Sequence, residues 1–156
     1  AQYAHEAGRK VALTLSDSFC VQRHHADFLA LVEDEVDLLF ANEHELQVLY
    51  GTENFEQAVG KLRENCPLAV VTRSKRGSAV ITADEFIEVP ALPVDPIIDA
   101  TGAGDLYAAG FFYGLTHGKT LEQSAEIGTI CAAEVIMHIG PRPLVPLASL
   151  LPPDLR

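Results

Sequence analysis

The chain has 156 residues, 48% of them hydrophobic and 21% charged, which is typical of a globular domain and excludes disordered and collagen-like chains. Its 22 acidic residues outnumber its 11 basic residues, and the net charge of −11 argues against nucleic acids and anionic membranes as partners. The three cysteines are scattered and lack the spacing of a zinc or thioredoxin-type site, so we expect reduced thiols and a cytoplasmic protein.

Short apolar runs alternate with amphipathic segments through the first half of the chain. Residues 1–8 resemble the end of a helix closed by Gly8, so we expect the chain to begin within a fold. Buried strands are predicted at residues 11–15, 36–42 and 68–72, and helices at residues 43–50 and 54–64. This alternation predicts an α/β domain with a largely parallel sheet.

The second half predicts an antiparallel edge hairpin followed by two long helices. Residues 78–82 and 85–90 form the predicted hairpin, and two prolines keep residues 92–98 extended. Helices are predicted at residues 106–117 and 121–139, with Tyr107, Phe111 and Phe112 in the core. Ligands of parallel sheets bind outside the carboxyl ends of the strands. The candidate loops are therefore residues 16–17, 42–45, 72–77 and 99–105.

A glycine-rich turn, Asp-Ala-Thr-Gly-Ala-Gly-Asp at residues 99–105, opens the first of these long helices. Its small residues leave the backbone amides open to a ligand, and a helix start favours an anion such as phosphate. The Asp105 carboxylate would repel a bound phosphate unless a cation or a proton intervenes. In phosphoryl transfer it can accept the proton of the attacking hydroxyl, which makes Asp105 a candidate general base. The structural alternative is that Asp105 is the helix N-cap and the glycines form a tight turn.

Two other loops carry polar side chains. Asn42 and Glu45 follow a predicted strand, and their structural alternative is a capping Asn42 with Glu45 on the exposed face of a short helix. Lys75 and Arg76 either neutralise a phosphate or lie in a solvated turn before the hairpin.

These segments together resemble the ribokinase-like (PfkB) carbohydrate and nucleoside kinases. Residues 99–105 resemble the family signature D-[TS]-T-G-A-G-D, with Ala100 as the one departure. Residues 42–45 resemble the N-x-x-E motif, and residues 72–77 resemble the T-x-G-x-x-G turn, with Ser74 in place of its first glycine. Residues 140–143 resemble the closing G-A-x-P motif.

The resemblance implies a ribokinase-like layered sandwich, with helices on both faces of the sheet, and an ATP-dependent kinase that uses Mg²⁺ and acts on a sugar or nucleoside hydroxyl. Asp105 would be the base, and the amides of Gly102, Ala103 and Gly104 would hold the transferred phosphate. Glu45 would bind Mg²⁺ through water, and Asp99 would bind a monovalent cation such as K⁺. The implied nucleotide contacts are Asn42, Glu45, Thr72, Ser74, Gly77, Thr101, Thr129 and Ala132.

Family members also have an N-terminal half, which carries a lid and most of the acceptor contacts. No segment of this chain resembles that half. The resemblance therefore implies that residues 1–156 are the C-terminal, nucleotide-binding portion of a kinase domain. We expect exposed edges and apolar faces to cause self-association or contact with the missing half. The alternative function is a catalytically silent nucleotide-binding or oligomerisation module. Residues 15–20 resemble the adenosine-kinase-like branch, which leaves the acceptor open between sugars and nucleosides.

Overall fold

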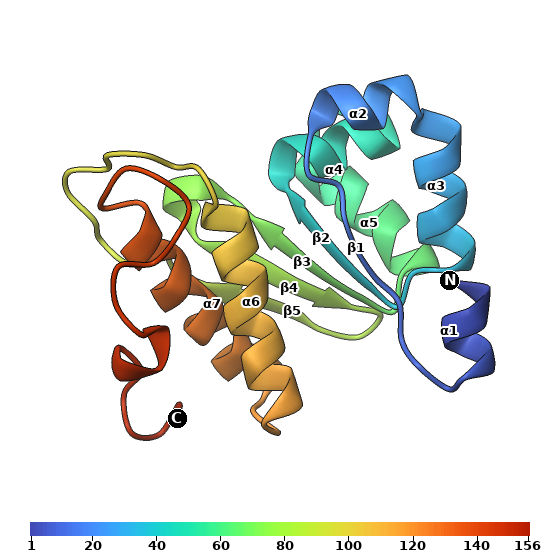
Figure 1. The fold of residues 1–156 in the computed structure, drawn as a ribbon. Coiled ribbons are helices and arrows are strands. Elements are labelled where there is room, and N and C mark those ends of the chain that lie inside the picture. Colours follow the sequence, from blue (N-terminus) through green and yellow to red (C-terminus); the bar gives the residue numbers. More distant parts are fainter. The chain divides into compact units, whose positions relative to one another are not determined.

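The structure, a computed structural model, describes all 156 residues (Figure 1). The chain divides into two compact units, one formed by Ala1–Arg73 with Ala79–Ile87 and the other by Ser74–Ser78 with Glu88–Arg156. None of the helices combines the length and the apolar character that crossing a bilayer requires.

The five strands form one mixed sheet in the order β1-β2-β3-β4-β5 (Figure 1). Strand β1 pairs in parallel with β2, and β2 pairs in parallel with β3. The short links before and after β4 cannot hold a parallel crossover, so β4 and β5 run antiparallel to their neighbours. The predicted parallel sheet with an antiparallel edge hairpin is therefore confirmed. The strands are β1 (Ala12–Thr14), β2 (Leu38–Asn42), β3 (Leu68–Thr72), β4 (Ser78–Thr82) and β5 (Phe86–Val89).

The first unit also contains five helices, and the apolar faces of α2 to α5 share a core with alternate residues of the strands, whereas α1 has no buried residue. Leu39 on β2, Val71 on β3 and Ile81 on β4 lie in the same buried cluster as Leu46 and Leu62 on the helices. Full burial of each such side chain contributes about 1.5–3 kcal/mol. The helices are α1 (Gln2–Glu6), α2 (Ser18–Arg23), α3 (His25–Asp34), α4 (Glu43–Tyr50) and α5 (Phe55–Asn65).

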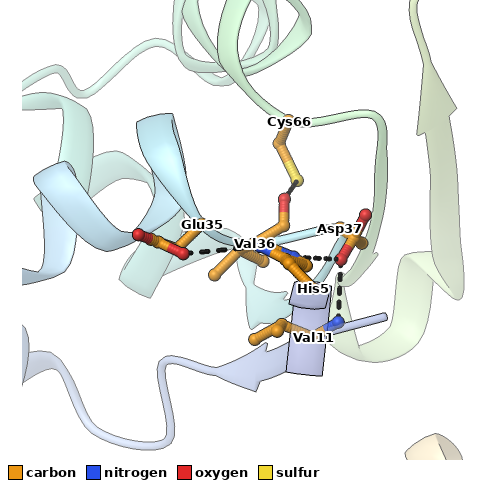
Figure 2. Close-up of polar contacts among 6 residues, drawn as sticks. All are labelled: His5, Val11, Glu35, Val36, Asp37 and Cys66. Carbon is orange, nitrogen blue, oxygen red and sulfur yellow. Dashed lines mark hydrogen bonds and ion pairs between the residues drawn. The ribbon is translucent and has the colours of Figure 1, made fainter. Parts of the chain in front are cut away.

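Polar contacts tie the amino-terminal segment to the residues that lead into β2 (Figure 2). The His5 imidazole lies between two carboxylates, 3.0 Å from Asp37 Oδ2 and 3.5 Å from Glu35 Oε2. The backbone N–H of Val11 also donates to Asp37 Oδ2, at 2.8 Å. This N–H and the His5 side chain lower the pKa of the Asp37 carboxyl. Helix α1 and the start of β1 are thus fixed by one carboxylate.

The second unit is built around α6 (Ala103–Thr116) and α7 (Leu121–Val135), together with the short 3-10 helices η1 (Ser74–Arg76) and η2 (Leu147–Ser149). Small residues let α6 and α7 approach closely. A Cβ added at Gly110 would lie 2.8 Å from the Gly128 Cα, and one at Gly114 would lie 2.5 Å from the Ser124 Oγ. The contact line between the two helices therefore excludes larger side chains at Gly110 and Gly114.

Two helix boundaries and one core residue differ from the predictions. Helix α6 begins at Ala103, three residues before the predicted start, because left-handed Gly102 acts as its N-cap. Helix α7 ends at Val135 instead of residue 139, and the next carbonyl, that of Ile136, accepts a hydrogen bond from the Ile98 N–H at 2.9 Å. Tyr107 and Phe111 are buried as expected, but Phe112 is 38% exposed.

Candidate functional site

The carboxyl ends of β2 and β3 place two predicted site residues side by side in the first unit. Asn42 ends β2, Thr72 ends β3, and the two are partners in the parallel register. The chain then turns from Asn42 directly into α4.

Asn42 and Glu45 form a reciprocal cap at the start of α4. The Glu45 backbone N–H donates to Asn42 Oδ1 at 2.8 Å, while the Asn42 backbone N–H donates to Glu45 Oε2 at 2.9 Å. The Asn42 side-chain amide donates to Glu45 Oε1 at 2.7 Å. Asn42 is thus a cap, as the structural alternative predicted, but the expected exposure of Glu45 is wrong because its side chain is folded back onto Asn42 and buried.

Burial raises the pKa of the Glu45 carboxyl, and the nearby Asp17 carboxylate raises it further, while the hydrogen bond from the Asn42 backbone opposes both effects. Each Glu45 oxygen accepts one hydrogen bond from Asn42 and retains a further lone pair. A magnesium ion generally keeps several of its waters in proteins. The residues therefore fit a Mg²⁺ ion held through water. The chain has no cluster of three or more His, Cys, Asp or Glu side chains suited to holding a metal directly.

Sequence reasoning missed Arg73, the residue that follows Thr72. Its Nε lies 3.2 Å from Glu43 Oε2, on the first residue of α4. Its guanidinium carbon lies 4.2 Å from the centroid of the Phe55 ring, on the first residue of α5. Thirty positions separate Glu43 from Arg73, and no local pattern signals that they pair.

The turn at residues 74–77, in the second unit, has two left-handed residues. Ser74 has a φ of +52°, which explains why the kinase motif has glycine at this position. Gly77 has a φ of +83°, and an added Cβ would collide with the carbonyl oxygen of Val89. The Gly77 N–H donates to the Ser74 carbonyl at 3.0 Å and closes the turn. Lys75 and Arg76 lie in this turn with exposed side chains.

Asp99 organises the glycine-rich loop before α6. Its Oδ1 accepts hydrogen bonds from the Thr101 N–H at 2.9 Å and the Thr101 hydroxyl at 2.6 Å. Its Oδ2 accepts from the Gly140 N–H at 2.9 Å. The Thr101 hydroxyl and then the two backbone N–H groups lower the pKa of Asp99 to about 2. Asp99 thus links the DATGAGD and GPRP segments through an ionised side chain.

Helix α6 begins with an open set of backbone donors. Gly102 is the N-cap with a φ of +82°, so Asp105 is the third residue of the helix and the interpretation of Asp105 as N-cap is wrong. The Ala103 N–H, one of the amides expected to hold the phosphate, donates instead to the Ala100 carbonyl at 3.2 Å. The next two amides, of Gly104 and Asp105, have no carbonyl partner within a helix that starts here. Both residues are exposed, and the positive end of the helix dipole lies among them.

The GPRP turn lies against this helix start. A Cβ added at Gly102 would lie 2.6 Å from the Pro141 Cβ and 2.9 Å from its Cα. The other two predicted residues of this unit, Thr129 and Ala132, lie on α7. Thr129 is buried, and its hydroxyl donates to the Ala125 carbonyl at 2.9 Å, whereas Ala132 is half-buried.

Residues 1–147 match the family model described as pfkB family carbohydrate kinase. A curated cytidine kinase from Thermococcus kodakarensis is 36% identical over 117 residues, covering 73% of this chain and 42% of the relative. Among solved structures, an adenosine kinase from Sinorhizobium meliloti is 48% identical with a TM-score of 0.92, covering 95% of this chain and 46% of the other.

A more distant structure, that of a putative ribokinase II from E. coli in complex with ATP and Mg²⁺, shares the fold with a TM-score of 0.82 at 21% identity. The match covers 94% of this chain and 48% of that one. The chain thus spans less than half the length of each of these three relatives. It belongs to the pfkB family of carbohydrate kinases.

Proposed function

We propose that the chain is the nucleotide-binding and catalytic-base portion of an ATP-dependent kinase, which moves the γ-phosphate of ATP to a hydroxyl of a nucleoside or sugar. One observation carries the proposal: helix α6 starts at a left-handed glycine, with open amides at Gly104 and Asp105 and an exposed Asp105 carboxylate in the same turn. Family membership supports the same function.

The open amides would hold the transferred phosphate. Backbone N–H groups at a helix start, together with the helix dipole, form a ready-made anion site. A transferring phosphoryl group spreads negative charge over its oxygens, and fixed donors stabilise that charge without reorganising during the reaction. Packing against Pro141 and the Asp99 hydrogen bonds hold Gly102 and its neighbours in this conformation.

The Asp105 carboxylate would accept the proton of the attacking hydroxyl. As the oxygen–hydrogen bond breaks, the acceptor oxygen forms its bond to the γ-phosphorus and ADP leaves with the electrons of the broken phosphorus–oxygen bond. The side chain is exposed, so an acceptor can reach it. No other side chain of this helix turn is titratable.

Asn42 and Glu45 would act on the magnesium ion that accompanies ATP. When bound, this ion neutralises charge on the phosphates. Glu45 would accept a hydrogen bond from a water of the ion, and the Asn42 cap fixes the carboxylate for that task. By resemblance we assign nucleotide contacts to Thr72, Ser74, Gly77, Thr101, Thr129 and Ala132, and a monovalent cation site to Asp99.

Nucleosides are the acceptors that we would test first. The cytidine kinase and the adenosine kinase described above are both nucleoside kinases by name. The segment Leu-Ser-Asp-Ser-Phe-Cys at residues 15–20 also resembles the adenosine-kinase-like branch. The acceptor contacts of the family's N-terminal half would complete the acceptor site.

The decisive experiment compares Asp105→Asn with Glu122→Gln, which removes a first-turn carboxylate from α7 in the same unit. ATP–Mg²⁺ binding is measured by calorimetry, and phosphate transfer is measured with adenosine, cytidine and ribose as acceptors. In the full-length enzyme that the proposal implies, we expect Asp105→Asn to keep ATP binding and to lose phosphate transfer by about two to four orders of magnitude, as for loss of a general base. Glu122→Gln in the same enzyme should behave like the unmodified protein. Normal turnover by Asp105→Asn would refute the assignment.

The open amides at the start of α6 would also serve a second function, a silent nucleotide-binding or oligomerisation module, because they can hold a phosphate without turnover. It predicts ATP–Mg²⁺ binding, or a stable oligomer in light scattering, without phosphate transfer to any acceptor. Phosphate transfer that depends on Asp105 would exclude it.

A further inference from the structure

Arg73 joins the end of β3 to the starts of two helices in the first unit. Its Nε lies 3.2 Å from Glu43 Oε2, and its guanidinium lies over the ring of Phe55 at 4.2 Å. The Arg73 side chain is only 10% exposed and that of Glu43 only 16%, so water screens the pair weakly. A guanidinium in this position combines an ion pair with stacking, which the compact ammonium of lysine does not reproduce.

These contacts close a short ring of residues around the cap of α4. Asn42 and Thr72 are partners in the parallel register of β2 and β3. Arg73 follows Thr72 in the chain, its side chain pairs with Glu43, and Glu43 follows Asn42. Asn42 belongs to this ring, and its backbone and side-chain amides hold both carboxylate oxygens of Glu45. A shift of the α4 start away from β3 would therefore move the Glu45 carboxylate with it.

We infer that Arg73 is a positioning residue, which holds the start of α4, and through it Glu45, in the orientation that magnesium-bound ATP requires. The inference rests on the proposed function for the role of Glu45. Residues that orient a metal-binding group without touching the metal contribute about 10- to 100-fold to metal affinity. Arg73 contributes in this way through its pairing with Glu43, and its contact with Phe55 keeps the guanidinium plane fixed.

The test compares Arg73→Ala, Arg73→Lys and Glu43→Gln with the control Arg63→Ala. Arg63 makes similar interactions from the last turn of α5: it lies over the Phe86 ring at 5.9 Å and donates to the Glu85 carbonyl at 3.1 Å. ATP binding is measured by calorimetry with Mg²⁺ and again with EDTA. Hydrogen exchange at the Glu45 amide, which donates to Asn42 Oδ1, reports the α4 start without any nucleotide.

We expect Arg73→Ala to weaken ATP binding about tenfold with Mg²⁺ and by about twofold or less with EDTA, and to speed Glu45 amide exchange about tenfold. Glu43→Gln should cause a smaller loss of magnesium-dependent ATP binding and a smaller increase in Glu45 amide exchange. Arg73→Lys should retain part of the binding that Arg73→Ala loses. Arg63→Ala should leave the magnesium dependence of ATP binding unchanged. If Arg73→Ala fails to fold, Arg73→Lys and Glu43→Gln decide the question.

Two results would overturn the inference. The first is that Arg73→Ala changes neither the magnesium dependence of ATP binding nor the rate of hydrogen exchange at the Glu45 amide. The second is an equal loss of magnesium-dependent binding in Arg63→Ala, since that would reflect general destabilisation. Failure of the unmodified chain to bind ATP–Mg²⁺ would instead overturn the proposed function and the magnesium role of Arg73. Exchange at Glu45 would then still decide whether Arg73 holds the start of α4.

Discussion

Replacing Gly102 with alanine tests how the glycine-rich loop is built. Gly102 has a φ of +82°, and alanine in the left-handed region costs about 1–2 kcal/mol. The new Cβ would also lie 2.6 Å from the Pro141 Cβ and 2.9 Å from its Cα. Because Pro141 is a rigid ring attached to backbone, it can yield only by moving the turn, and overpacking of this kind costs about 1–3 kcal/mol. The expected total loss of unfolding free energy is about 2–5 kcal/mol.

Gly118 provides the matched control at the other end of α6. It has a φ of +72° and nothing within 4 Å of an added Cβ, so Gly118→Ala should cost only the conformational part, about 1–2 kcal/mol. Urea unfolding followed by far-ultraviolet circular dichroism measures both variants, and the difference between them isolates the contact with Pro141. Adding Pro141→Gly to Gly102→Ala should recover part of that difference. Equal destabilisation of the two alanine variants would refute the proposed packing of the loop on the GPRP turn.

Two further predictions concern the loops that carry the site. Asp99 has a pKa of about 2 in the folded chain, below the ordinary value of about 3.9. Its ionised form therefore stabilises the fold fully at neutral pH. This stabilisation is lost as the pH falls from about 4 towards 2. The stability difference between the unmodified chain and Asp99→Asn should therefore shrink over that range in acid unfolding, and a difference independent of pH would contradict the account. Ser74 has a φ of +52°, so Ser74→Gly should raise the unfolding free energy by about 0.5 kcal/mol, because relief of the left-handed strain exceeds the added entropy of the unfolded chain. A lowered melting temperature would contradict it.

Local signals in the sequence predicted much of the fold and some of the site geometry. The alternation of short apolar runs with amphipathic segments predicted the parallel strands. The short link between the apolar runs at residues 78–82 and 85–90 predicted the hairpin. Asn42 was recognisable as a cap because a cap and its helix are neighbours in the chain. The burial of Glu45 was missed, although an N-x-x-E spacing is also that of a capping box, in which the glutamate folds back onto its cap.

Contacts between distant segments account for what the sequence did not predict. Pairing of Arg73 with Glu43 depends on β2 and β3 being neighbours, so it has no local pattern. The early end of α7 reflects hydrogen bonds from Ile98 to the Ile136 carbonyl and from the Leu144 N–H to Glu134, both made by separate loops. Asp99 likewise reaches Gly140, 41 positions away, to fix the loop before α6.

The most direct test of the central claim follows the backbone amides at the start of α6 by NMR. A ¹⁵N-labelled sample is titrated with Mg²⁺ and a non-hydrolysable ATP analogue, and separately with Mg²⁺ and ADP. We predict that the amide signals of Gly104 and Asp105 move with the triphosphate far more than with ADP, while those of Gly118 and Glu122 stay in place. If the analogue binds and the Gly104 and Asp105 amides do not respond, the start of α6 does not hold the terminal phosphate.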